Sequence, residues 1–99
     1  MARFDIFEND GSDGYLLDVQ SDLLIGLNTR VVVPLLPRSK APTPAQRLNP
    51  VFLVSDTEVI MVTQFIAAIP SRELRKRIGN LGNEQQPITE ALDMLFLGF

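Results

Sequence analysis

The chain has 99 residues, of which 45% are hydrophobic, and a formal net charge of −3, so we expect one small folded domain over residues 1–99 rather than a disordered chain. It contains no Cys and no His, which excludes disulfides and removes the commonest metal ligand and general base, so we expect no zinc site and no cofactor. No apolar run approaches the roughly 20 residues of a membrane helix and no signal peptide is recognisable, so we expect a cytoplasmic protein that does not act on membranes.

The first third of the chain predicts three short strands. Residues 3–7 alternate polar and apolar side chains, residues 8–14 are dense in turn formers, and residues 15–20 return as the second strand of a hairpin. Residues 29–35 are rich in Val and predict a third strand. Pro34 lies near the end of this strand and indicates a sheet edge or a bulge there.

A long loop and a second hairpin follow. Residues 36–50 contain four prolines and three basic residues, which is typical of a surface loop. Residues 51–55 and 58–64 flank the dipeptide 56–57 and predict a hairpin around it. Residues 65–70 predict the last strand.

Two helices are predicted in the last third of the chain. Ser71 can cap a short basic helix over residues 72–78 that ends at Gly79. After a loop over residues 80–86, Pro87 suits the first position of a terminal helix. The apolar residues of this helix recur at helical spacing and predict one inward-facing stripe, composed of Ile88, Ala91, Leu92, Leu95, Phe96 and Phe99.

Leu97 is the residue that this packing stripe does not explain. It falls about 180° from Ile88 around the helix, among the polar positions, and Met94 lies one turn earlier. Such an exposed apolar pair is either incidental or a small recognition patch. Short strands followed by one terminal helix predict an α+β fold with a small antiparallel sheet or barrel.

Charge is unevenly distributed along the chain. Residues 1–22 carry six acidic side chains against one base, residues 30–50 carry four bases and no acid, and residues 71–77 carry four bases and one acid. This segregation fits either a charged partner for the basic segments or solvated loop charges. The negative net charge argues against direct DNA binding.

Five stretches, in order, together resemble the CcdB family of bacterial toxins from toxin–antitoxin modules. They are LLDVQSDLL (16–24), TRVVVPL (29–35), RLNPVFLV (47–54), VIMVTQFIAAIP (59–70) and ALDMLFLGF (91–99). The resemblance implies a small SH3-like antiparallel barrel or sheet of the CcdB, MazF and Kid type with a C-terminal α-helix. It also implies a homodimer without catalytic activity that binds the dimerisation region of the DNA gyrase A subunit, blocks or poisons the enzyme, and is neutralised by a CcdA-like antitoxin. DNA would be met only through gyrase or the antitoxin.

The resemblance also assigns gyrase-binding positions. Carried over by motif, they are Leu23, Leu24, Asp93, Phe96, Leu97, Gly98 and Phe99. The best-known form of the family has Trp where this chain has Leu97, stacking on a gyrase arginine. Leu97 offers apolar area without that cation–π contact.

The same residues have ordinary structural explanations. At least one of the adjacent pair Leu23 and Leu24 is expected to point inward in an extended segment. Phe96 lies on the packing stripe, Gly98 can relax the helix end, and Asp93 can be a solvated helix carboxylate.

Asp18, Asp22 and Arg30 also have structural readings. Asp18 and Asp22 are interpreted as turn and hydrogen-bonding residues rather than as a catalytic pair. Arg30 is either an ion-pair partner at the edge of the core or an anion binder.

Two alternatives stand beside gyrase inhibition. The first is a MazF-like endoribonuclease, in which Arg30 with Thr29 or Thr63 would neutralise and position a phosphate. The second is a decayed toxin that retains only antitoxin binding. In that case the basic segments would receive an acidic disordered peptide.

Overall fold

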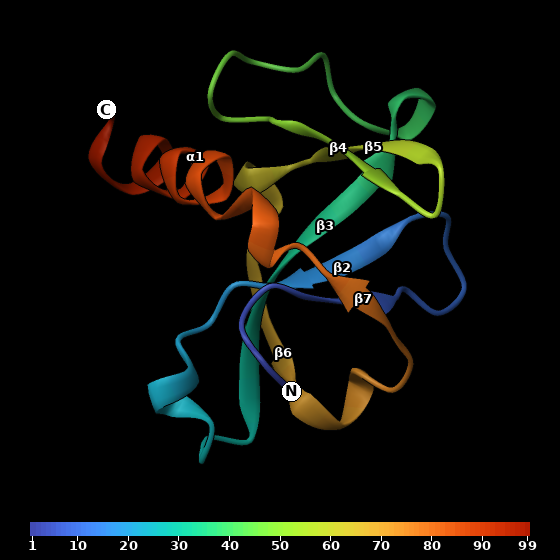
Figure 1. Ribbon diagram of the computed structural model, residues 1–99, viewed down its shortest axis with the longest axis vertical. Helices are drawn as coiled ribbons and strands as arrows, with labels where there is room; N and C mark the ends of the chain where they lie inside the picture. Colours follow the sequence, from blue (N-terminus) through green and yellow to red (C-terminus); the bar gives the residue numbers. More distant parts are fainter.

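A curled antiparallel sheet forms the body of the molecule in the computed structural model, which describes residues 1–99 (Figure 1). Its strand order is β4-β5-β3-β2-β1-β7, and β6 pairs separately with β3. The strands are β1 (Asp5–Glu8), β2 (Tyr15–Asp18), β3 (Thr29–Pro37), β4 (Val51–Val54), β5 (Thr57–Met61), β6 (Ala67–Pro70) and β7 (Arg77–Asn80). One C-terminal helix, α1 (Gln85–Leu97), completes the fold and confirms the predicted α+β class.

β3 is the central strand, and Pro34 lies inside it rather than at a sheet edge. The start of β3 pairs with β6 up to Val32, whereas its end pairs with β5 from Leu35 onward. Pro34 therefore falls in the gap between two partners, where its missing N–H breaks no ladder. Its carbonyl accepts a hydrogen bond from the Val62 N–H, at 3.0 Å, where the chain passes from β5 toward β6.

The β4–β5 hairpin turns at Ser55 and Asp56, one residue earlier than predicted. Both residues have positive φ, 52° and 63°, as a tight two-residue hairpin turn requires. Val54 then pairs with Thr57, and the side chains of Phe52 and Val54 point into the core.

The predicted basic helix over residues 72–78 is wrong. The structure has only a short 3-10 turn at Ser71–Glu73, followed by strand β7 (Arg77–Asn80). β7 pairs with β1, and the side chains of Arg77 and Asn80 both donate to the Asp5 carboxylate at 2.9 Å. Strand pairing with a distant segment has overridden the local helical pattern.

The core lies between the concave face of the sheet and the start of α1. Ile88 and Ala91 are fully buried there and are the only buried residues of the helix. The helix begins at Gln85, two residues before Pro87, and its far end projects away from the sheet (Figure 1). No helix of the structure has the length and apolar character needed to span a bilayer.

Candidate functional site

The first candidate surface is the apolar loop, residues 21–28, between β2 and β3. It contains one short 3-10 turn, Asp22–Leu24, in which the Ser21 hydroxyl accepts a hydrogen bond from the Leu23 N–H at 3.2 Å. Leu23 is 94% exposed. Leu24, Ile25 and Leu27 are exposed as well. The prediction that Leu23 or Leu24 points inward is therefore wrong, because the loop stands off the body of the sheet.

Ile25 and Leu27 received no role from either the residue pattern or the family resemblance. They extend the exposed surface that Leu23 and Leu24 begin. The sequence did contain an indication of this exposed surface. Residues 23–27 (LLIGL) form an apolar run without strand alternation, in a segment that contains Gly26 and Asn28.

The second candidate surface is the terminal apolar segment, residues 96–99. Phe96 is 68% exposed, Leu97 60% and Phe99 75%. The prediction that Leu97 faces outward is confirmed, whereas the inward assignment of Phe96 and Phe99 is wrong. The helical spacing is regular, but the last turn of α1 lies beyond the part that contacts the core, so its stripe has nothing to pack on (Figure 1).

Gly98 ends the helix. Its φ of +81° places it in the left-handed region, and its N–H donates to the carbonyls of Asp93 and Met94. The Asp93 side chain is only half-buried in the last turns. Gly98 thus has a structural role, because it ends the helix in a left-handed conformation.

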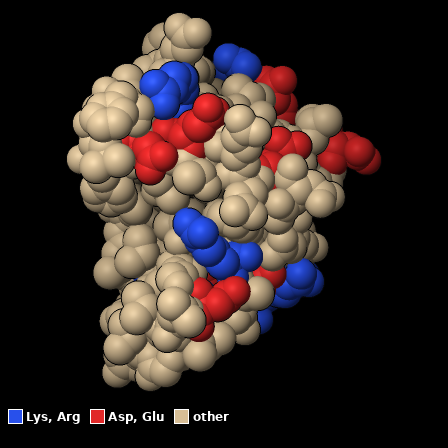
Figure 2. All heavy atoms as spheres, turned by 60° about the vertical axis from the view of Figure 1, so that its left-hand side comes forward, with Lys and Arg blue, Asp and Glu red and all other residues tan.

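The two apolar surfaces are well separated along the longest axis, with the end of α1 at the upper left of Figure 1 and the apolar loop at the lower left. Figure 2 shows that the lowest part of the molecule, at the height of the apolar loop, is almost free of charged side chains. Within a single chain the loop and the helix end therefore do not form one continuous patch.

A buried ion pair lies at the base of the apolar loop. Arg30 is 2% exposed, and its Nη2 lies 2.7 Å from Oδ2 of the fully buried Asp18. Burial raises the pKa of the Asp18 carboxyl above its ordinary value of 3.8, while the hydrogen bonds from Arg30 and the Gln20 N–H favour the carboxylate. Of the two readings of Arg30, the structure supports the ion-pair partner.

The residues named for ribonuclease chemistry are not arranged for it. Arg30 is committed to Asp18 and is closed to solvent, so it cannot reach a phosphate. Thr63 is also buried, and its hydroxyl donates to the Leu48 carbonyl. Asp22 is exposed and accepts a hydrogen bond from the Arg3 N–H at 2.8 Å, so it forms no pair with Asp18.

Many of the segregated charges meet in the fold. Three exposed or partly exposed ion pairs join the acidic and basic segments: Lys40 with Asp13, Lys76 with Glu8, and Arg77 with Asp5. A fourth joins Arg38 to Glu58 of β5. Such pairs contribute little stability, but they neutralise charge that looks available in the sequence. Arg47, Arg72 and Arg75 stay outside any ion pair.

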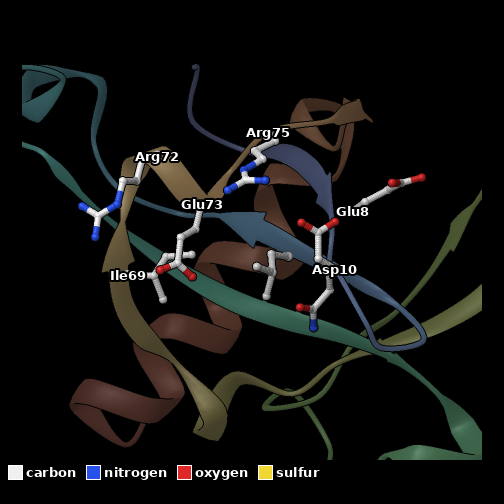
Figure 3. A pocket seen from close by; sticks show the side chains of 8 residues that line it. Glu8, Asp10, Ile69, Arg72, Glu73 and Arg75 are labelled. Carbon is white, nitrogen blue, oxygen red and sulfur yellow. The ribbon is translucent and has the colours of Figure 1, made fainter.

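Two of these free arginines border a hollow of about 280 Å³. Its lining also includes Ile69 and the carboxylates of Glu8, Asp10 and Glu73. Figure 3 shows the guanidinium groups of Arg72 and Arg75 apart, with Glu73 between them. This mixture of charges favours contacts with a flexible polar chain over a site for one compact anion. No cluster of three or more His, Cys, Asp or Glu residues is placed to hold a metal ion.

Comparison with known families returns a match over nearly the whole chain. The family model described as CcdB protein matches residues 3–98. The matched range includes the apolar loop, the buried Asp18–Arg30 pair and all of α1.

Proposed function

The chain belongs to the CcdB family of toxins from toxin–antitoxin modules, and we propose that it inhibits DNA gyrase by binding the gyrase A chain through its two apolar surfaces. The observation that carries the proposal is the exposure of large apolar side chains at both positions to which the family resemblance assigns gyrase contacts. Leu23 in the apolar loop and Leu97 in the terminal apolar segment have no packing role that explains them.

A homodimer would let these surfaces act together. A two-fold axis duplicates each surface, and two terminal apolar segments could then bridge a symmetric target. The exposed Phe65 and the unpaired outer edge of β6, which carries exposed Ala67 and Ala68, support self-association. Light scattering after size-exclusion chromatography tests this over a dilution series, with about twice 11.0 kDa expected. A monomer at every concentration refutes it.

A CcdA-like antitoxin is the proposed second partner. Arg47, Arg72 and Arg75, which form no ion pair within the chain, are basic side chains available to pair with an acidic segment that orders on binding. We expect a CcdA-like antitoxin to restore the activity of inhibited gyrase, and we propose that both proteins act in the cytoplasm. The charge-reversal variant Arg75→Glu should weaken that rescue and leave inhibition itself unchanged.

A supercoiling assay with purified gyrase tests the central proposal. We expect the intact chain to inhibit supercoiling, and both a chain lacking residues 97–99 and Leu23→Asp to inhibit much less. Leu53→Asp is the matched control, because Leu53 is 71% exposed on β4, apart from both apolar surfaces. Equal supercoiling with and without the intact chain refutes gyrase inhibition. If antitoxin binding nevertheless persists, the decayed-toxin alternative replaces it.

A further inference from the structure

Polar contacts fasten the apolar loop at both ends. An exposed run of Leu and Ile would ordinarily fold back onto apolar surface, so its position needs a separate physical cause. At the entry, the Asp22 carboxylate accepts the Arg3 N–H at 2.8 Å. At the exit, the Asn28 carbonyl accepts both the N–H and the hydroxyl of Ser71, at 2.9 and 3.1 Å.

Gln20 joins the interior of the loop to the sheet. Its side chain is buried, and its Oε1 accepts the Val31 N–H at 3.0 Å. Its Nε2 donates to the Thr29 carbonyl at 3.1 Å and to the Leu24 carbonyl at 3.3 Å. One amide group thus ties β3 to the middle of the loop.

Asp18 and Arg30 in turn hold Gln20 in place. Its N–H donates to Oδ1 of Asp18 at 3.0 Å, while Nε of Arg30 donates to Oδ2 of the same carboxylate at 2.9 Å. A continuous set of hydrogen bonds, buried at Arg30 and Asp18 and part-buried at the loop, therefore leads from Arg30 through Asp18 and Gln20 to the Leu24 carbonyl. Buried networks rigidify what they connect when their members are satisfied, and both polar atoms of the Gln20 amide have partners here. At the far end of the network, Nη1 of Arg30 has no partner and Nη2 contacts Asp18 only as an ion pair.

We propose that Gln20 is a positioning residue, which holds the apolar loop in the conformation that presents Leu23 and Leu24 to the target. The proposal rests on the proposed gyrase contact of that loop. A loop fixed before binding does not lose backbone freedom on association, so its apolar area converts more fully into affinity.

Gln20→Glu keeps the acceptor contact of the amide and removes its two donor contacts. The carboxylate keeps an acceptor for the Val31 N–H but replaces the Nε2 donor with an oxygen that faces the Thr29 and Leu24 carbonyls. The contact with the Val31 N–H survives, whereas the contacts with the Thr29 carbonyl at the start of β3 and with the Leu24 carbonyl in the loop both become repulsive.

Asn49→Asp is the matched control. Asn49 is a buried amide with the same pattern on a different loop, since its Oδ1 accepts the Ala45 N–H at 3.0 Å. Its Nδ2 donates to the Met61 carbonyl at 3.0 Å and to Oε1 of Gln64 at 2.8 Å. It reports the general cost of putting a carboxylate in place of a buried amide.

Amide hydrogen exchange and affinity for the gyrase A dimerisation fragment are measured on the full chain. In the wild type, we expect the Leu24 and Leu27 amides to be protected. In Gln20→Glu, we expect them to exchange about tenfold faster or more, relative to the β3 and β5 amides. The same variant should bind the fragment about fivefold or more weakly. Asn49→Asp should change neither the exchange of the Leu24 and Leu27 amides relative to β3 and β5 nor the affinity for the fragment.

Several results overturn the proposal. Unprotected Leu24 and Leu27 amides in the wild type do so without any variant, which covers the case of a Gln20→Glu chain that fails to fold. Unchanged loop exchange in Gln20→Glu, or faster exchange with unchanged affinity, also overturns it. A wild type that does not bind the fragment refutes the gyrase contact instead, while hydrogen exchange still decides whether Gln20 holds the loop.

Discussion

Replacing Leu97 by Trp should strengthen gyrase binding while leaving the fold as stable as before. Leu97 is the last residue of α1 and is 60% exposed, so a larger side chain there displaces no packed neighbour. Exposed substitutions of this kind usually change the free energy of unfolding by less than about 0.5 kcal/mol. Any change in affinity would therefore come from the contact with the target.

The size of the effect follows from the exposed area. Full burial of a Leu side chain contributes about 1.5–3 kcal/mol, and three-fifths of Leu97 is still available, so a target gains about 1–2 kcal/mol from each copy. If an arginine of the target lies over the new ring, Leu97→Trp adds about 0.5–2 kcal/mol of cation–π energy. That gain corresponds to a dissociation constant about 2- to 30-fold lower.

Isothermal titration calorimetry with the gyrase A dimerisation fragment measures these differences. Leu97→Asp should weaken binding by about 5- to 30-fold, because it removes the roughly 1–2 kcal/mol that the apolar area supplies. Leu53→Trp, on β4, controls for non-specific adhesion of an exposed indole. Equal gains from Leu97→Trp and Leu53→Trp, or an undiminished affinity of Leu97→Asp, would refute the assignment of Leu97 to the contact.

Three further predictions concern stability. Ile88→Ala should cost about 2–5 kcal/mol in urea unfolding, since Ile88 is fully buried against the sheet; a cost under about 1 kcal/mol would contradict the core assignment. Gly14→Ala should cost about 1–3 kcal/mol more than Gly11→Ala, because both glycines have positive φ but only at Gly14 would a methyl group meet the Leu35 carbonyl. Equal costs would rule out that clash. Burial alone would raise the pKa of Asp5, but hydrogen bonds, the first from the Asn80 side chain, outweigh it and hold the pKa below 3.8. The stability that Asp5 contributes is therefore fully present above about pH 3.8 and is lost as the pH falls through its folded pKa. In Asp5→Asn, the free energy of unfolding from urea titrations should therefore fall less steeply as the pH is lowered. An unchanged slope of this free energy against pH would contradict the lowered pKa of Asp5.

Most of the strands and the terminal helix could be located along the sequence because each has a local pattern. Alternation and turn residues located β1, β2 and the β4–β5 hairpin, and the spacing of Ile88 and Ala91 located the buried side of α1. β7 was missed for the opposite reason. Its residues favour helix locally, and the bonds that make it a strand come from Asp5 and its neighbours, more than 70 residues earlier.

The candidate site was predictable only in part. The family resemblance assigned gyrase contacts to Leu23, Leu24, Leu97 and Phe99, yet no periodicity could say how exposed they are. Arg30 looked equally suited to bind an anion until its burial against Asp18 was known.

The sequence by itself determined which segments form most of the strands and the terminal helix, and that apolar residues are concentrated in residues 21–28 and at the chain end. Tertiary structure alone decided which of those residues remain exposed. The physical reason is that burial depends on where the sheet ends. Phe96 continues the same helical stripe as Ile88, but the sheet supports only the start of α1, so an identical pattern buries one residue and leaves the other in water.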